Sequence, residues 1–397
     1  MSVLIRLIAS LLAFALVLPP IAAQAQFASC VSELKSTALA QGIKAQTFER
    51  TMAGVEADPK VLEAMDIQPE FKTPIWDYLA GLVDQDKIKD GLSRLKTYAA
   101  PLAAAESKYG VDRHAILAVW GVETDYGNNF GKWPLPQSLS TIACSQSKRR
   151  DYFRGELMSL LKIVDRGDLD PQVLKGSWAG AFGHTQFMPT TYLKLAVDGD
   201  GDGRRDLVGS IPDALHSTAN YLAKSGWITG DVWGYEVKIP NNYAGPSGRT
   251  DRRPLAFWSE RGLKKIDGSA LSGSKPAGLL LPAGAQGPAF LVFKNYDAIF
   301  SYNGADSYAL AISILSDHLR GKSGIQTPWP TDDPGLSRAE RKEVQTLLLA
   351  RGFDIGTVDG AIGNRTREAI AIVQGQSGLE PDGHAGQKIL HVLRNAR

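Results

Sequence analysis

The pattern of apolar positions divides the chain into a helical body, a β-rich insert and a helical tail. From about residue 30 to residue 95, apolar residues recur at helical spacing, as at Val31, Leu34 and Ala38. The same periodicity predicts helices over 98–109, 112–123, 150–164, 211–225 and 307–319. Most of the chain is therefore expected to be helical.

A different pattern begins near residue 231. Residues 233–239, 255–258 and 289–294 alternate or run apolar over strand lengths, and Gly, Pro and Asn residues separate them. These segments predict a small antiparallel β subdomain inserted into the helical body. Residues 322–334 have the composition of a linker. Three further helical stretches from residue 336 onward predict a compact module at the end of the chain.

Length and composition restrict the class of protein. The 397 residues exceed one ordinary hydrophobic core, so two or three domains are expected. With 44% hydrophobic and 22% charged residues, the composition is that of a globular protein. The net charge of +2 gives no reason to expect a nucleic acid partner. The six histidines form no zinc-binding signature.

The N-terminus has the three parts of a secretory signal. Arg6 precedes an apolar run over 7–18, and a small-x-small cleavage pattern follows at 23–25. A transmembrane helix needs roughly 20 apolar residues, and this run is shorter. We therefore predict a signal peptide over 1–25 and export of the mature chain.

Cys30 and Cys144 are the only cysteines. In an oxidising compartment they most simply form one disulfide that closes a long loop. Alternatively, residues 27–30 form a lipoprotein cleavage box. That reading is weaker, because Phe27 stands where such boxes favour Leu and a good cleavage site already precedes it.

Glu123 is the first candidate for chemistry. It ends the apolar run 114–123 and shares a helix face with Ile116, Val119 and Trp120. A carboxylic acid among apolar neighbours keeps its proton more readily, as a general acid must. The alternative is a glutamate at a frayed helix end that points into water.

Two later segments carry further candidates. The Gly-rich segment 176–192 contains Gln186, whose amide must find partners in an otherwise apolar turn. The glycines alone can be explained by close helix packing. Asp198, Asp200 and Asp202 repeat the first half of an EF-hand loop, to which Arg204 adds a backbone carbonyl. The alternative is a solvated acidic loop.

Four segments taken together resemble the membrane-bound lytic murein transglycosylase B family. They are residues 121–127, 176–192, 196–207 with 219–222, and 300–303. The resemblance implies a mainly α (α+β) fold, with a lysozyme-like helical core and a small β insert. It also implies cleavage of the β-1,4 bond between N-acetylmuramic acid and N-acetylglucosamine without water, which leaves a 1,6-anhydro ring. Exo and endo action both remain open.

The resemblance assigns roles to individual residues. Glu123 is the implied catalytic residue. The implied substrate-binding residues are Ser177, Gln186, Tyr221, Tyr302 and Asn303, with Arg149 and Arg150 on the peptide stem carboxylates. Relatives complete the calcium loop with a later aspartate, which suggests Asp213 as a ligand of a structural Ca²⁺. No cofactor is implied for catalysis.

The chemistry of the residues agrees with a single catalytic carboxylate. A glycosidase that uses water generally has two carboxyl groups about 5–9.5 Å apart. Asp125 lies two positions after Glu123, so on a continuing helix it points elsewhere. One acid/base suffices if the muramic C6 hydroxyl is the nucleophile. A hydrolytic muramidase and a non-catalytic wall-binding scaffold are the alternatives, and retention of Glu123 argues against the scaffold.

The tail resembles the three-helix peptidoglycan-binding module. Asp359-Gly360 and the Gly363-x-x-Thr366 pattern match it, while Val373 stands where the module commonly has Phe. The expected plan is a signal peptide over 1–25, a catalytic domain over 26–322 with a β-rich insert at about 231–300, a linker over 323–335 and this module over 336–397. We expect a periplasmic monomer that binds peptidoglycan glycan strands and associates with the wall or the membrane surface.

Overall fold

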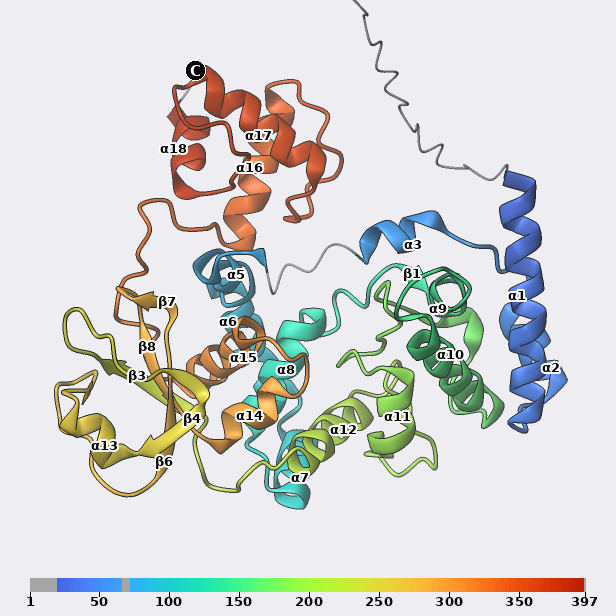
Figure 1. The fold of residues 1–397 in the computed structure, drawn as a ribbon, viewed down its shortest axis with the longest axis horizontal. Helices are drawn as coiled ribbons and strands as arrows, with labels where there is room; N and C mark the ends of the chain where they lie inside the picture. Colours follow the sequence, from blue (N-terminus) through green and yellow to red (C-terminus); the bar gives the residue numbers. More distant parts are fainter. Residues whose placement is uncertain (1–19, 66–71, 396–397) are drawn as a thin grey trace, which may run out of the picture.

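The computed structural model describes residues 20–65 and 72–395 and is mostly helical (Figure 1). Residues 1–19 of the expected signal peptide lie outside the described residues. The body contains α1 (Pro20–Ala40), α2 (Ala45–Met52), α3 (Pro59–Ala64), α5 (Ile75–Leu82), α6 (Gln85–Thr97), α7 (Ala99–Tyr109), α8 (Arg113–Thr124), α9 (Leu135–Ala143), α10 (Arg150–Asp165), α11 (Pro189–Leu195), α12 (Ile211–Lys224), α14 (Lys294–Phe300) and α15 (Asp306–Leu319). Short β1 (Trp133–Pro134) and β2 (Lys175–Gly176) pair within it. The predicted mainly helical architecture is confirmed.

Helix α8 lies at the centre of the body. Every residue from Ala115 to Gly121 is buried, and α15, α6, α12 and α7 pack around the helix. Asp112 caps its N-terminus by accepting hydrogen bonds from two backbone N–H groups. A second apolar core joins α1, α2, α9 and α10. Tyr221 and Tyr302 pack against both cores, so these two expected substrate-binding residues lie where the cores meet.

The β insert is one antiparallel sheet with the strand order β4-β6-β8-β3-β5. Its strands are β3 (Gly234–Lys238), β4 (Gly248–Pro254), β5 (Lys264–Lys265), β6 (Pro276–Leu280) and β8 (Ala289–Val292), and β7 (Pro282–Ala285) lies beside them. Two of the three predicted strands are found in β3 and β8.

The predicted strand over 255–258 is wrong, because these residues form helix α13 (Leu255–Glu260). Trp258 is fully buried on this helix and donates a hydrogen bond from Nε1 to the Ala277 carbonyl at 2.9 Å. Tertiary packing of one large aromatic side chain thus overrides the strand-like composition. Strand β4 was missed because it is an edge strand rich in arginine. Its Arg249 pairs with Asp297 at 2.6 Å instead of presenting an apolar face.

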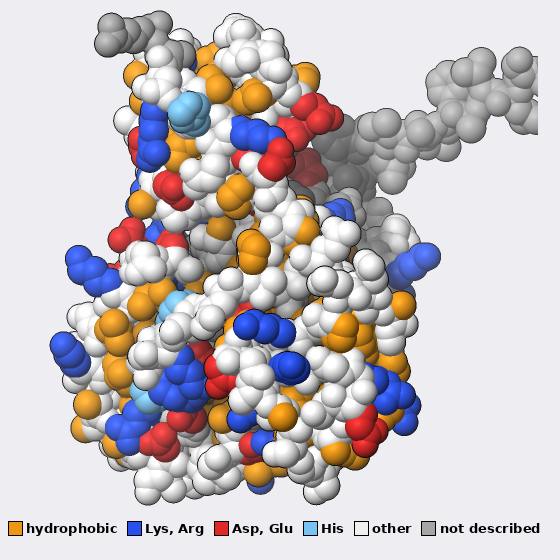
Figure 2. All heavy atoms as spheres, turned by 90° about the vertical axis from the view of Figure 1, so that its left-hand side faces the viewer, with side chains coloured by type: hydrophobic (Ala, Val, Ile, Leu, Met, Phe, Trp, Pro, Cys, Tyr) orange, Lys and Arg blue, Asp and Glu red, His pale blue; other side chains and the backbone are white. Residues whose placement is uncertain are grey.

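The C-terminal module contains α16 (Arg338–Ala350), α17 (Asn364–Gln376) and α18 (Gln387–Asn395) around its own apolar core. It stands beside α5 in Figure 1 and forms the upper lobe in Figure 2. The predicted linker lies along the body. Two of its backbone N–H groups donate to Glu236 at 2.8 Å, and Trp329 contacts Trp76 with ring centroids 6.4 Å apart. The linker is therefore held against the helical body.

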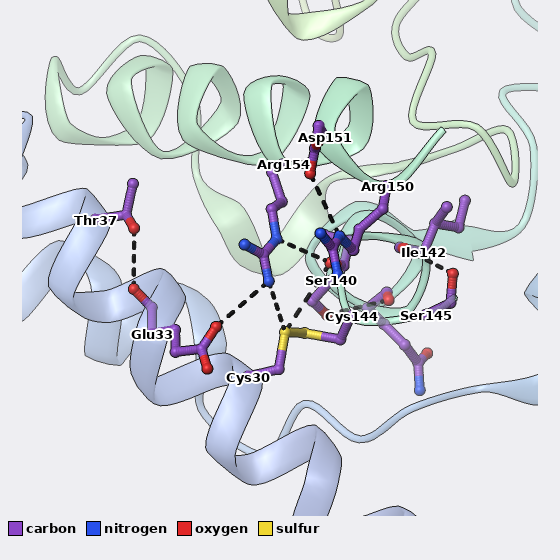
Figure 3. The surroundings of a disulfide bond; sticks show 12 residues. Cys30, Glu33, Thr37, Ser140, Ile142, Cys144, Ser145, Arg150, Asp151 and Arg154 are labelled. Carbon is purple, nitrogen blue, oxygen red and sulfur yellow. Dashed lines mark hydrogen bonds and ion pairs between the residues drawn. A yellow bond between two sulfur atoms is a disulfide. The ribbon is translucent and has the colours of Figure 1, made fainter. Parts of the chain in front are cut away.

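The predicted disulfide is confirmed. Cys30 of α1 and Cys144 at the end of α9 are bonded, with their Cα atoms 5.7 Å apart (Figure 3). Arg154 of α10 adds a hydrogen bond to the Ala143 carbonyl at 3.1 Å and an ion pair with Glu33 at 3.5 Å. A sulfur atom in a disulfide cannot also form the thioether of a lipid anchor, so the structure agrees with the disulfide and not with the lipoprotein alternative.

Charge is mixed over the surface. Basic and acidic side chains are interspersed on the face shown in Figure 2. Within residues 20–65 and 72–395, no helix has both the length and the apolar character needed to cross a membrane.

A histidine joins the module to the body and makes the stability depend on pH. His384 lies between two aspartates, with Nε2 2.9 Å from Asp77 and Nδ1 3.1 Å from Asp333. The hydrogen bond to Asp77 and the charge of both carboxylates raise the pKa of His384 to about 9. The protonated form thus stabilises the docked module. This contribution is complete below the ordinary histidine pKa of about 6.5 and is lost as the pH rises through about 9.

We expect the melting temperature of the full chain to fall by roughly 2–4 °C more in wild type than in His384→Gln between about pH 6.5 and about pH 10. Glutamine carries no titrating proton, so the variant loses this part of the pH dependence. Calorimetry of both proteins across the pH range checks the prediction. If the melting temperatures of the two proteins change equally with pH, the charge of His384 does not stabilise the contact between module and body.

Candidate active site

Glu123 lies in the last turn of α8, at the wall of a cavity of about 450 Å³. The helix is buried up to Gly121, and Glu123 itself is half-buried. Val122, Asn303, Tyr308 and Tyr78 are further lining residues. The carboxylate thus lies between the apolar core and solvent, where it is accessible to a ligand.

The cavity also has a wall from the C-terminal module. Ile362, Arg367, His384 and Ala385 line it opposite the body, together with Leu336 and Arg341. The sequence did not predict this, because periodicity within the module carries no information about which domain it contacts.

Tyr308 holds the carboxylate. Its hydroxyl donates a hydrogen bond to Glu123 Oε1 from the first turn of α15. Burial and the negative charge of Glu123 raise the pKa of Tyr308 well above its usual range, so the phenol keeps its proton and remains a donor. Tyr308 was not selected from the sequence, although the neighbouring Tyr302-Asn303 pair marks the same segment.

A chain of aromatic rings extends from Tyr308 away from Glu123. The rings of Tyr308 and Tyr302 are stacked with centroids 6.3 Å apart, and Tyr302 contacts Tyr221 at 4.6 Å. Phe187 contacts both Tyr221 and Tyr302, at 5.9 and 6.0 Å. Tyr302 also donates from its hydroxyl to the Thr185 carbonyl at 2.8 Å. The rings therefore connect Glu123 to the turn that contains Gln186.

The Gly-rich turn is fastened to α8 through a neutral histidine. Trp120 Nε1 donates to His184 Nδ1 at 3.1 Å, and Thr124 Oγ1 donates to the His184 carbonyl at 2.6 Å. Burial lowers the pKa of His184 to about 4, so its ring is neutral and accepts the indole hydrogen bond. This arrangement fixes the turn relative to the helix that carries Glu123.

The side chains predicted for sugar binding within this turn have internal partners. Ser177 Oγ accepts a hydrogen bond from the Ala181 N–H at 3.0 Å. Gln186 has a left-handed backbone with φ of 50°, and its Nε2 donates to the Gly183 carbonyl at 3.0 Å. Of the described residues, Glu123 and Asn303 are the predicted site residues that line the 450 Å³ cavity. Tyr221 and Gln186, which precedes Phe187, lie along the aromatic path beyond it, and Ser177 lies in the same Gly-rich segment as Gln186.

The two predicted stem-contacting arginines lie at the start of α10. The Arg149 guanidinium stands over the rings of Tyr152 and Phe153, at 5.3 and 5.1 Å. Phe153 in turn contacts Trp178, next to Ser177, with centroids 6.4 Å apart. Arg150 pairs with exposed Asp151 at 3.3 Å (Figure 3). Phe153 and Trp178 thus connect Arg149 to the segment that contains Ser177.

The acidic loop brings three carboxylates together. Oxygen atoms of Asp198, Asp200 and Asp202 lie within 4.8 Å of one another. Asp213 is fully buried behind them, and its two oxygens accept from the N–H groups of Gly199 at 2.7 Å and Asp206 at 2.6 Å. Hard oxygen ligands converging from one short loop fit a Ca²⁺ ion. Asp213 braces the loop backbone from behind.

The comparisons with known proteins decide the family. The family model of the transglycosylase SLT domain matches residues 26–317, and that of the putative peptidoglycan binding domain matches residues 337–393. The first match alone covers well over half of the chain. The chain belongs to the SLT transglycosylase family. It is therefore a lytic transglycosylase, an enzyme that acts on peptidoglycan, and the resemblance found from the sequence is confirmed.

Proteins similar to this chain are also lytic transglycosylases. Membrane-bound lytic murein transglycosylase B of Escherichia coli K12 is 30% identical over 287 residues, which are 68% of this chain and 77% of that protein. SltB3 of Pseudomonas aeruginosa, in complex with NAG-anhNAM-pentapeptide, is 44% identical with a TM-score of 0.74, over 93% of this chain and 99% of that chain. The Escherichia coli lytic transglycosylase Slt35 in complex with calcium is 28% identical with a TM-score of 0.65, over 76% and 94%.

We expect Tyr308→Phe to lower kcat about 10- to 100-fold with little change in KM, because a hydrogen bond to a charged group contributes about 1.5–3 kcal/mol. Tyr296→Phe is the matched control, since that buried hydroxyl donates to the Asp306 carbonyl at 2.9 Å instead. Steady-state kinetics on purified peptidoglycan distinguish the two variants. An unchanged kcat in Tyr308→Phe would remove the tyrosine from the catalytic arrangement.

Proposed function

We propose that this lytic transglycosylase cleaves the β-1,4 bond between N-acetylmuramic acid and N-acetylglucosamine without water, with Glu123 as the single general acid and then base. The observation that carries the proposal is the Tyr308–Glu123 hydrogen bond at the wall of a cavity large enough for sugar rings. In the first step Glu123 gives its proton to the glycosidic oxygen, and the bond from that oxygen to muramic C1 breaks. In the second step Glu123 takes the proton of the C6 hydroxyl as the C6 oxygen bonds to C1.

The proton balance explains why one carboxylate suffices. The proton given to the leaving glucosamine is replaced by the proton of the C6 hydroxyl, so no water is consumed and Glu123 ends as it began. General acid and base catalysis of this kind contributes roughly 10²- to 10⁴-fold. Tyr308 supports the carboxylate form between the two steps by donating to Oε1.

A second carboxylate in the cavity lining, that of Asp77, is engaged with the C-terminal module. Asp77 Oδ2 is 2.9 Å from His384, and its Oδ1 is buried beside Gly335. Its charge is therefore directed to the module. This arrangement favours the single-carboxylate mechanism over a hydrolytic muramidase, which generally needs a pair of carboxyl groups.

We further propose that the glycan strand follows the aromatic path from Glu123 toward Ser177. Tyr302, Asn303, Tyr221, Gln186 and Ser177 would contact the sugars along it, and Arg149 with Arg150 would meet the stem carboxylates. Tyr221 and Tyr302 are part-exposed on this path, which supports the proposal, because a part-exposed aromatic ring offers an apolar surface to the face of a sugar. Solved structures of SltB3 contain NAG-anhNAM-pentapeptide and NAG-NAM-pentapeptide, which supports the same class of ligand here.

The cellular location also belongs to this proposal. A disulfide between Cys30 and Cys144 suits an oxidising compartment, and the sequence over 1–25 has the form of a secretory signal. We infer that the enzyme acts in the periplasm and that the C-terminal module holds it to the wall.

We expect Glu123→Gln to reduce cleavage of purified sacculi at least about 10³-fold while sedimentation with the sacculi is retained, because the amide keeps the shape and loses the proton. Asp77→Asn is the matched control, and we expect it to retain cleavage within several-fold of wild type. Mass spectrometry of the soluble products measures both. Near-normal turnover by Glu123→Gln would reject the assignment, and a dead Asp77→Asn would favour a two-carboxylate mechanism.

We propose that the loop of Asp198, Asp200 and Asp202 binds a structural Ca²⁺, with the Arg204 carbonyl as a fourth ligand. Three like charges within 4.8 Å repel one another unless a cation neutralises them. A structure of Slt35 contains calcium, which supports the proposal. Asp213, whose two oxygens accept from backbone N–H groups of the loop, would hold the loop in the shape that presents these ligands.

Calcium is expected to raise the melting temperature of wild type by several degrees through preferential binding to the folded state. Asp200→Asn should lose most of this increase. Asp354→Asn, which changes an exposed aspartate of the C-terminal module, should keep it. Thermal melts in calcium and in chelator make the comparison. The site is rejected if chelator leaves the wild-type melting temperature unchanged.

A further inference from the structure

One buried carboxylate caps helices from both parts of the molecule. Asp84 Oδ1 accepts a hydrogen bond from the Lys87 N–H at 2.7 Å and so caps α6 of the catalytic body. Its Oδ2 accepts from the N–H of Arg338, the first residue of α16 in the C-terminal module, at 3.0 Å. The start of the module is thereby fixed to the start of α6.

Lys87, on the same turn of α6, holds the end of the helix that carries Glu123. Its buried Nζ donates to the Gly121 carbonyl at 2.9 Å and lies 3.0 Å from Asp125 Oδ1. Gly121 belongs to the last turn of α8, and its carbonyl also accepts a hydrogen bond from the Asp125 N–H at 3.1 Å. Burial lowers the pKa of Lys87, and the pairing with Asp125 offsets part of that effect.

Asp125 ends α8 and receives a second cation from the module. Its backbone is left-handed, with φ of 54°, and the chain leaves the helix at this point. The Arg338 guanidinium contacts Asp125 Oδ2, while its other nitrogen is 3.7 Å from Asp90. Burial tends to raise the pKa of Asp125, but the charges of Lys87 and Arg338 hold it below its ordinary value.

We propose that Arg338 is a positioning residue for Glu123. Through Asp125 and Lys87, the docked C-terminal module fixes the last turn of α8 and with it the direction of the Glu123 carboxylate. Turnover thus depends on the module by a route separate from its binding of the wall. This inference rests on the proposed role of Glu123 as the acid and base.

The geometry separates positioning from substrate binding. Among the described residues, Arg338, Lys87 and Asp125 are absent from the lining of the Glu123 cavity. Their contacts are with Gly121 and Asp125, each two positions from Glu123, so they influence the carboxylate only through the helix backbone. A displacement of about 1 Å at a reacting group costs up to about 10²-fold in rate. Loss of Arg338 should therefore lower kcat and leave KM nearly unchanged.

The test is a double-mutant cycle in the full-length enzyme. Asp125→Asn removes the charge and keeps a residue that tolerates the left-handed backbone. We expect Arg338→Gln and Asp125→Asn each to lower kcat roughly tenfold on soluble uncrosslinked glycan strands, with KM within about twofold. The double variant should be no slower than the slower single variant, because both changes break one connection. Arg338→Lys should recover part of the rate.

Arg394→Gln is the matched control, because Arg394 pairs with Glu343 within the module at 2.7 Å and should leave kcat unchanged. Wild-type kcat in Arg338→Gln, or strictly multiplicative losses in the double variant, would overturn the positioning role. Glu123→Gln is measured in the same series. If it is inactive, failure of the Arg338 prediction leaves the proposed function intact, and if it is active, both proposals fail.

Discussion

The burial of α8 is the constraint on which the rest of the structure depends. The buried stretch Ala115–Gly121 of α8 ends just before Glu123, so the last turn of the helix carries Glu123 to the wall of a cavity. The end of such a helix has unsatisfied carbonyl groups, which need partners. Lys87 of α6 adds a second donor to the Gly121 carbonyl, which already accepts from the Asp125 N–H, and Thr124 fastens the same turn to the Gly-rich segment by donating to the His184 carbonyl. The contacts that hold the last turn of α8 thus also fix the position of the Glu123 carboxylate.

The site also requires both apolar cores at once. One core supplies α8 and α15, which bring Glu123 and Tyr308 together, and the other supplies the turn that carries Gln186. Tyr302 packs against both and connects them through stacked rings and its hydrogen bond to the Thr185 carbonyl. The C-terminal module then closes one side of the cavity through His384 and Arg367. The C-terminal module is therefore directly adjacent to the cavity that contains Glu123.

Local patterns in the sequence predicted most of the helices. The features that were not predicted depend on contacts between residues far apart in the chain. Helical periodicity located α8 and the three helices of the module, and the cysteine count predicted the Cys30–Cys144 bond. Residues 255–258 were taken for a strand because their composition is apolar and aromatic, whereas Trp258 packs against the sheet from a helix. Tyr308 was missed because its contact with Glu123 spans 185 residues. The sequence predicted only that Asp125 points away from Glu123, and its partner Arg338 comes from a different domain.

The central claim is that one carboxylate directs a ring closure in which water takes no part. Digestion of purified peptidoglycan in isotopically labelled water tests it directly, with mass spectrometry of the first products formed. The account predicts muramic ends that contain no label and are lighter by one water than hydrolysed ends. Labelled reducing ends formed at the same rate as cleavage would contradict it and would make the enzyme a hydrolase.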